Sequence, residues 1–201
     1  MLAVTAPPES SAEQLTRAMR TLEAAFLLGV EGVTEIWLVR HADAYDGVTE
    51  VGDPPLSMRG RDQAKRLADR VRRVEVDAVY ASPLARAQET ARAISPDVRT
   101  DPRLAEMALV ITEDGGIEFT EEPLAVAARM RAALADLTAA HVGKRVVVVS
   151  HAAAIIALLT DLLMLEPGRL RVLPYYTSVS VVRALGDRHM VGTFGDVSHL
   201  E

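Results

Sequence analysis

Two histidines and two arginines stand where they could act together on a phosphate group. Arg40 and His41 directly follow one apolar run, His151 follows another, and Arg86 lies four residues after Ser82. Arginine offers a planar fork that pairs two oxygens and stays charged, and neutral imidazole is a nucleophile near pH 7. Phosphoryl transfer depends mainly on positioning and charge stabilisation. These residue types therefore predict phosphoryl chemistry, with a carboxylic acid needed to protonate the leaving oxygen.

A single sheet would bring these four residues together. Apolar runs at residues 35–39, 77–81 and 145–149 have the length and composition of strands. Each run ends in polar residues, among them Arg40-His41 and Ser150-His151. Ligands of open α/β sheets bind beyond the carboxyl ends of the strands. We therefore expect one crevice that both histidines and both arginines line.

Helical segments separate the predicted strands. One helix is expected to begin at Ser57, and another at Ser82-Pro83, where a capping residue precedes proline. The remaining predicted elements are helices over residues 122–141 and 152–165 and strands over residues 178–184 and 189–194. The last two strands, joined by Gly186-Asp187, resemble a hairpin. This order predicts an α/β fold, a three-layer sandwich with a mostly parallel mixed sheet and helices on both faces.

An extra helix is predicted before this fold. Ser10 and Glu13 have the spacing of a capping box, and Gly29 supplies a stop signal. Apolar residues recur on one face at Leu15, Met19, Leu22 and Phe26. We expect residues 1–33 to form a tail and an amphipathic helix, and residues 34–201 to form the main domain. The apolar stripe would pack on that domain or on a second subunit, which makes a homodimer possible.

The composition limits the classes of partner. The chain has 201 residues, 49% hydrophobic and 25% charged, with a formal net charge of −6. A negative balance argues against nucleic-acid binding, which needs a basic face. The absence of cysteine excludes disulfides and thiolate catalysis. No apolar run suits a membrane span and no secretory signal is evident, so a cytoplasmic location is the expectation.

Five blocks of sequence, in order, resemble the histidine phosphatase superfamily, the phosphoglycerate-mutase-like group. They are LVRH at 38–41, PLSMRGRDQA at 55–64, SPLARAQETA at 82–91, LAE at 104–106 and VSH at 149–151. The segment GDVSHL at 195–200 also resembles a loop of bacterial members. A single block would be weak evidence, because Arg-His pairs arise by chance, whereas five blocks in order are strong evidence.

The resemblance implies a role for each matched residue. His41 would attack phosphorus and become phosphohistidine, while Arg40 and Arg86 would bind the phosphoryl oxygens. His151 would complete the phosphate pocket and take part in catalysis, and Glu106 would be the proton donor. Members of this group need no metal or cofactor. Ordinary structural roles remain the alternative, most readily for Glu106.

Three departures from the family pattern are expected to bear on turnover. Ala42 and Ala152 stand where the family usually has glycine after each histidine. Residues 43–47 replace an acidic-threonine pair and an asparagine that often helps to hold phosphate. None of these changes removes the nucleophile or a charged phosphate ligand.

The short segment between Glu106 and His151 favours a phosphatase over a mutase, because a mutase must shield its phosphoenzyme from water. The predicted reaction is hydrolysis of a phosphate monoester, from either a phosphorylated small molecule or a phosphoprotein. A cofactor-dependent phosphoglycerate mutase and a non-catalytic phosphate-binding protein are the alternatives. Acidic residues within 113–122 favour a substrate that carries a single phosphate.

Overall fold

The computed structural model describes residues 10–45 and 52–201. The chain divides after Glu31 into two compact units, which are described separately. Within the described ranges, no helix is long and apolar enough to cross a membrane. The departures from the family pattern at residues 46 and 47 lie outside the described residues.

The first unit contains helix α1 (Ser11–Ala25), whose capping box is confirmed. Ser10 N donates to Glu13 Oε2 over 2.7 Å, and Glu13 N donates to Ser10 Oγ over 3.3 Å. The helix ends at Ala25, before the predicted stop at Gly29, because Leu27 already adopts a left-handed φ of 57°. No residue of α1 is buried, and packing of its apolar stripe stays a prediction.

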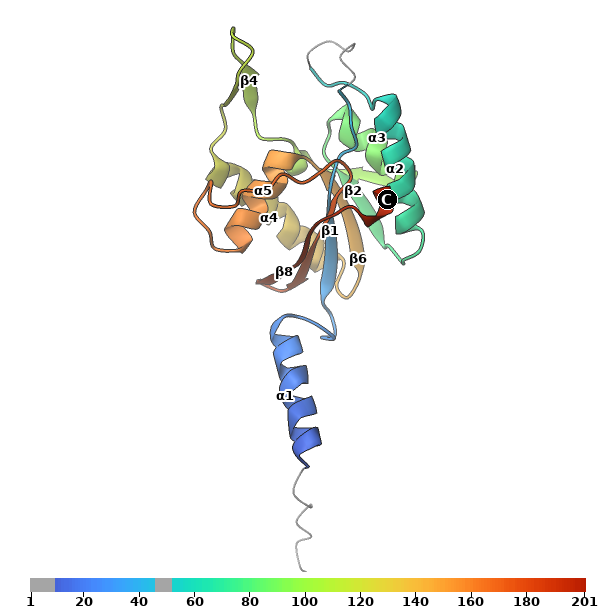
Figure 1. Cartoon of the computed structure of the whole chain (residues 1–201), viewed down its shortest axis with the longest axis vertical. Helices are drawn as coiled ribbons and strands as arrows, with labels where there is room; N and C mark the ends of the chain where they lie inside the picture. Colours follow the sequence, from blue (N-terminus) through green and yellow to red (C-terminus); the bar gives the residue numbers. More distant parts are fainter. Residues whose placement is uncertain (1–9, 46–51) are drawn as a thin grey trace, which may run out of the picture. The chain divides into compact units, whose positions relative to one another are not determined.

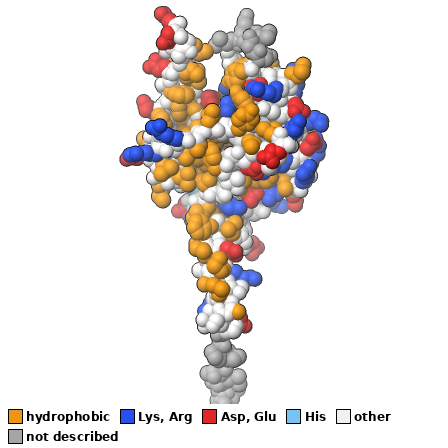
Figure 2. Space-filling view, in the orientation of Figure 1, with side chains coloured by type: hydrophobic (Ala, Val, Ile, Leu, Met, Phe, Trp, Pro, Cys, Tyr) orange, Lys and Arg blue, Asp and Glu red, His pale blue; other side chains and the backbone are white. Residues whose placement is uncertain are grey.

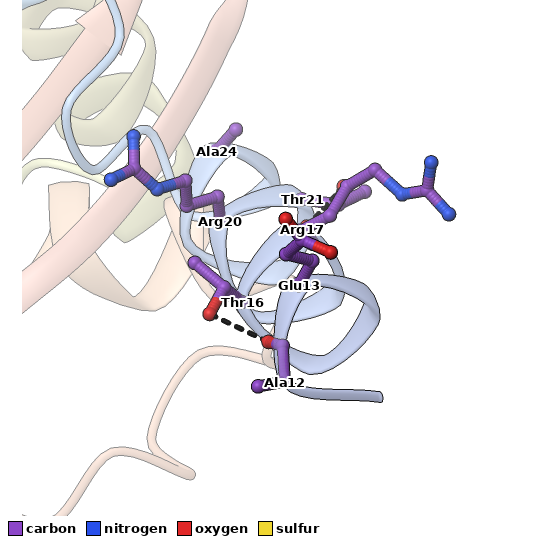
Figure 3. Close-up of a pocket in the computed structure, with 7 residues that line it drawn as sticks. All are labelled: Ala12, Glu13, Thr16, Arg17, Arg20, Thr21 and Ala24. Atoms are coloured by element: carbon purple, nitrogen blue, oxygen red, sulfur yellow. Dashed lines mark hydrogen bonds between the residues drawn. The ribbon is translucent and has the colours of Figure 1, made fainter. Parts of the chain in front are cut away.

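The side of α1 away from the apolar stripe carries a groove between its own side chains (Figure 3). Thr16 Oγ1 donates to the Ala12 carbonyl over 2.9 Å, and Thr21 Oγ1 donates to the Arg17 carbonyl over 2.9 Å. These bonds satisfy the threonine hydroxyls within the helix. The groove is therefore an ordinary polar helix surface.

The second unit is built on a six-stranded sheet in the order β3-β2-β6-β1-β7-β8. The strands are β1 (Thr34–Arg40), β2 (Ala78–Ala81), β3 (Val98–Thr100), β6 (Arg145–Ser150), β7 (Val179–Leu185) and β8 (Arg188–Asp196). The neighbours from β3 to β1 pair in parallel, whereas β7 pairs antiparallel with β1 and with β8. The predicted mixed, mostly parallel sheet and its closing hairpin are confirmed.

Helices cover both faces of the sheet, as predicted (Figure 1). Helices α2 (Met58–Val71) and α3 (Ala85–Ile94) lie on one face, and α4 (Pro123–Ala140) and α5 (Ala152–Leu162) lie on the other. The central strands alternate their side chains between two cores, with Val146 and Val148 in one and Val147 and Val149 in the other. Burying each such side chain contributes about 1.5–3 kcal/mol, so β6 is anchored on both faces.

The predicted helix start at Ser82-Pro83 is wrong. Helix α3 begins at Ala85, and its N-cap residue, Leu84, makes no side-chain cap bond. Ser82 Oγ instead accepts a hydrogen bond from Leu84 N over 3.3 Å and contacts His151 Nε2 at 2.8 Å. The serine therefore closes a turn before the helix, which frees its hydroxyl to orient a histidine.

Several short elements were not predicted. They are β3, the hairpin of β4 (Leu109–Ile111) and β5 (Ile117–Phe119), and the 3₁₀ turns η1 (Pro102–Leu104) and η2 (Ser198–Leu200). All six hairpin strand residues are exposed, so no in-and-out alternation marks them. Helix α5 also ends at Leu162, earlier than the predicted residue 165.

Candidate active site

The two central parallel strands, β1 and β6, bring the two histidines together. Arg40 and Ser150 are register partners at the ends of these strands, and His41 N donates to the Ser150 carbonyl over 2.9 Å. The His41 and His151 ring centroids lie 5.0 Å apart, and both side chains are buried. The expected crevice therefore forms at the carboxyl edge of the sheet.

The hydrogen bonds of His41 fix its tautomer. Nδ1 lies 2.7 Å from the Ala42 carbonyl oxygen, which can only accept, so Nδ1 carries the hydrogen. On the other side of the ring, Arg86 Nε donates to Nε2 over 3.3 Å. Burial, together with Arg86 and Arg40, lowers the pKa of His41 to about 3. The ring is thus neutral near pH 7, with its lone pair on Nε2.

Arg86 is the arginine nearest this lone pair. It lies in the first turn of α3 and is almost fully buried. Its Nη1 pairs with Asp53 Oδ1 at 3.2 Å, and Asp53 Oδ2 also accepts from Ala85 N over 2.7 Å. Asp53 was assigned no role in the site by the sequence analysis. Its carboxylate in fact lies on the guanidinium that the resemblance assigns to phosphate.

Arg40 is held by groups from the segment before β7. Its Nη1 donates to the Pro174 carbonyl over 2.8 Å, and its guanidinium lies 4.0 Å from the centre of the Tyr176 ring. Thr177 N donates to the Arg40 carbonyl over 3.0 Å. Arg40 Nε is buried without a hydrogen-bond partner. Because a buried, unpaired donor is costly, this N–H suits an incoming anion.

His151 offers a second unpaired donor. Ser82 Oγ accepts from Leu84 N, so its own hydrogen can go to His151 Nε2, 2.8 Å away. That arrangement leaves the hydrogen of His151 on Nδ1, which is buried without a partner. Burial, with His41 and Arg86, lowers the pKa of His151 well below its usual value. His151 is therefore a neutral N–H donor beside His41.

Tyr176 and Thr177 were missed by the sequence analysis. The Tyr176 ring lies 5.9 Å from the His41 ring as well as against Arg40. Thr177 adopts a left-handed φ of 59° while fully buried, a conformation that costs about 1–3 kcal/mol. The adjacent aromatic pair Tyr175-Tyr176 was the only signal available in the sequence.

Glu106 lies at the N-terminus of α5. Its Oε1 accepts from Met107 N over 2.8 Å and from Ala154 N over 3.1 Å, and its Oε2 accepts from Ala153 N over 3.4 Å. These bonds cap the helix that directly follows His151. They fix the carboxyl group beside that histidine, and the proton-donor role stays a prediction.

The alanine that follows His41 is accommodated without displacing the site. Ala42 N donates to Thr90 Oγ1 over 3.0 Å, and its methyl group packs with Leu56 and Ala64 in a small buried cluster. The next turn is held tightly, because a Cβ on Gly60 would come within 1.9 Å of the Asp43 carbonyl oxygen. A glycine is thus required where α2 approaches the backbone after His41.

Potential metal ligands do not cluster in the part of the chain that the structure describes. Within residues 10–45 and 52–201, no three histidine or carboxylate side chains are placed as a metal site would require. The groups that contact the His41 ring are instead Arg86, His151, Tyr176 and the Ala42 carbonyl oxygen.

The sequence matches the histidine phosphatase superfamily (branch 1) over residues 36–122 and 112–196. The chain belongs to this superfamily. Relatives include the probable phosphoglycerate mutase GpmB of Enterobacter sp. (strain 638), 30% identical over 83% of this chain and 95% of that protein. The predicted superfamily is therefore confirmed.

Solved structures support the same assignment. YhfR of Bacillus stearothermophilus superposes with a TM-score of 0.71 at 25% identity, over 84% of this chain and all of that one. Phosphoserine phosphatase of Entamoeba histolytica, in complex with 3-phosphoglyceric acid, has a TM-score of 0.73 at 21% identity over 84% of this chain and 100% of its own. The α/β architecture is thus that of histidine phosphatases.

Proposed function

We propose that this protein hydrolyses a phosphate monoester through a phosphohistidine at His41, without a metal ion. The observation that carries the proposal is the unprotonated Nε2 of His41, which faces the guanidinium of Arg86. Two unpaired donors, Arg40 Nε and His151 Nδ1, add to the same pocket. A nucleophile surrounded by buried N–H donors suits a phosphoryl group, whose oxygens gain charge stabilisation from each donor.

The reaction would proceed in two displacements. Nε2 of His41 attacks phosphorus while the bond from phosphorus to the ester oxygen breaks, and Glu106 donates a proton to the leaving alcohol. Water then attacks the phosphohistidine, Glu106 accepts its proton, and the P–N bond breaks to release inorganic phosphate. Arg40, Arg86 and His151 would hold the phosphoryl oxygens throughout both steps.

Hydrolysis is favoured over transfer to a second hydroxyl because the described residues give the site little cover. Between Glu106 and β6, the chain forms only a small hairpin and α4. The hairpin strands are exposed along their whole length. A mutase must keep water from its phosphoenzyme, whereas a phosphatase requires water there. The phosphatase structures among the neighbours agree with this choice, and the relatives named as probable mutases supply the alternative.

The first test is hydrolysis of p-nitrophenyl phosphate by wild type, His41→Ala and His189→Ala, with and without EDTA. His189 is a matched control on β8, at the antiparallel edge of the sheet. We expect wild type and His189→Ala to turn over equally in EDTA and His41→Ala to be inactive. Equal activity of His41→Ala and wild type, or complete loss in EDTA, would refute the proposal.

Transfer activity needs its own assay. Conversion of 3-phosphoglycerate to 2-phosphoglycerate, primed with 2,3-bisphosphoglycerate, is expected to be much slower than release of inorganic phosphate. A transfer rate above the hydrolysis rate would identify a mutase instead.

A further inference from the structure

A cavity of about 510 Å³ is lined by Glu106 and by Ala152, the sequence neighbour of His151, and its volume is within the range of small-molecule sites. Its wall begins at Ala152, the residue that follows His151, and includes the Glu106 carboxyl group. It continues over Ile156 on α5 and Leu124 at the start of α4. A molecule whose phosphate sits at His41 and His151 could therefore extend into this cavity.

The wall is strongly apolar. Its lining residues carry polar side chains only at Glu106, Thr160 and Asp161. The rest of the wall comes from the β4–β5 hairpin, the two helices and the segment after α5. Hydrophobic side chains gather over this part of the surface in Figure 2. An apolar cavity that residues 10–45 and 52–201 leave unfilled indicates a ligand of matching character.

The charges of the wall exclude a second anionic group. No lysine or arginine belongs to it among the described residues, and its two charged members are both carboxylates. Asp161 is already paired with Arg131, and Glu106 is held by backbone N–H groups. A substrate carboxylate placed here would be desolvated next to like charge without a partner.

We propose that the substrate is a phosphate monoester of a hydrophobic alcohol, alkyl or aryl, whose hydrocarbon part occupies this cavity. The inference rests on the proposed function for the phosphate end and on the cavity for the alcohol end. Ala152 and Ala153 have small side chains, which leave room where the ester carbon would enter from the phosphate pocket. The exposed side chains of Phe119 and Leu124 would cover the far end of the hydrocarbon.

The test compares ethyl, butyl and hexyl phosphate as substrates. Each buried methylene can raise kcat/KM by at most about fourfold, and hexyl phosphate has four more methylenes than ethyl phosphate. Allowing for incomplete burial, we expect kcat/KM to rise by at least about tenfold from ethyl to hexyl phosphate. The double variant Phe119→Ser/Leu124→Ser should lose most of this rise while hydrolysing ethyl phosphate at the wild-type rate. Both side chains are about half or more exposed, at 52% and 66%, so the variant is expected to fold.

Val110→Ser is the matched control, because Val110 is 47% exposed on the same hairpin but does not line the cavity. Its register partner is Glu118, whereas Leu109 pairs with Phe119 on the cavity side. This variant should keep the full dependence on chain length. A flat or falling series in wild type, or a rise that survives Phe119→Ser/Leu124→Ser, would overturn the proposal.

Binding of the corresponding alkyl phosphonates, measured by calorimetry, separates this proposal from the proposed function. Affinity that rises with chain length, without turnover of any ester, would support the cavity assignment and refute the hydrolase. Turnover without any dependence of affinity on chain length would support the hydrolase and refute the cavity assignment. Conversion of a dimer to a monomer by Phe119→Ser/Leu124→Ser, with a flat series, would show that a second subunit fills the cavity instead.

Discussion

Arg86 Nε lies 3.3 Å from Nε2 of His41, so the guanidinium donates to the very nitrogen that would attack phosphorus. Phosphate cannot be attacked while that lone pair is engaged. An incoming phosphoryl group must therefore accept the guanidinium hydrogen bond in place of Nε2. Binding of the substrate would in this way free the lone pair of Nε2 for attack. In the proposed reaction, Arg86 would therefore bind the phosphate and, without ligand, occupy the lone pair of the imidazole.

Two substitutions of Arg86 should separate the effect of its charge on activity from the effect of its planar shape. Arg86→Lys keeps the charge but loses the planar fork, and we expect kcat/KM for p-nitrophenyl phosphate to fall by roughly 10–100-fold. Arg86→Ala should fall by about a thousandfold, the scale for loss of a preorganised donor. Steady-state kinetics on variants with a native circular dichroism spectrum provide the measurement. Activity of Arg86→Lys within threefold of wild type would contradict a bidentate role.

Asp53 is expected to compete with the substrate for Arg86. Its Oδ1 lies 3.2 Å from Arg86 Nη1, but its side chain is 40% exposed, so solvent screens the pair. We expect Asp53→Asn to tighten inhibition by inorganic phosphate by about two- to fivefold, equivalent to roughly 0.4–1 kcal/mol. Asp62→Asn, which alters an exposed pair with Arg66 on α2, is the control. Weaker inhibition in Asp53→Asn would mean that the carboxylate positions Arg86 instead.

The protonation state of His41 can be observed directly. With its pKa lowered to about 3 by burial, Arg86 and Arg40, the ring should remain neutral at pH 5, where an ordinary histidine is charged. Nitrogen-15 NMR of histidine-labelled protein should show a protonated Nδ1 and an unprotonated Nε2 from pH 8 to pH 5. The His41→Asn spectrum assigns the signals. A signal that titrates near pH 6.5 would refute this assignment.

The same burial makes folding sensitive to acid. The folded-state pKa of His41 lies below the unfolded value of 6.5, so between these values the unfolded chain binds the extra proton. The stabilisation is complete above pH 6.5 and is lost as pH falls toward 3. Denaturant titrations from pH 6.5 to 5 should show a slope about 1 kcal/mol per pH unit smaller in His41→Gln than in wild type. Equal slopes would show that His41 is protonated in the folded protein.

Tyr176 is expected to position Arg40. Its ring lies 4.0 Å from the guanidinium and 5.9 Å from the His41 ring. Tyr176→Ala should raise KM for p-nitrophenyl phosphate several-fold, since the stacked guanidinium loses its support. Tyr176→Phe keeps the ring and should restore the wild-type KM. Equal defects in both variants would point to the hydroxyl group rather than to stacking.

The sequence predicts those residues of the site that lie at the ends of strands. Arg40, His41 and His151 come at the ends of apolar runs, and parallel strands bring such ends to one edge. The same buried runs predict the sheet and its two helical layers. Patterns of burial are legible in a sequence because they repeat with the period of the element.

Features that depend on one side chain reaching across the fold were not predictable. Asp53 meets Arg86 from a loop, and Ser82 bonds His151 instead of capping α3. The β4–β5 hairpin escaped prediction because its strands bury nothing and so have no periodic signal. The sequence around each residue does not indicate its partner, because the two residues meet only once the sheet has assembled.

The hydrogen bond from His41 N to the Ser150 carbonyl extends the β1–β6 ladder into the active site. Amide hydrogens in a central ladder exchange with solvent only through large-scale opening. The His41 amide should therefore be among the slowest to exchange, although it belongs to the catalytic residue. A ligand that binds here would slow that exchange further, so deuterium uptake at one peptide group would report occupancy for substrates that are never turned over.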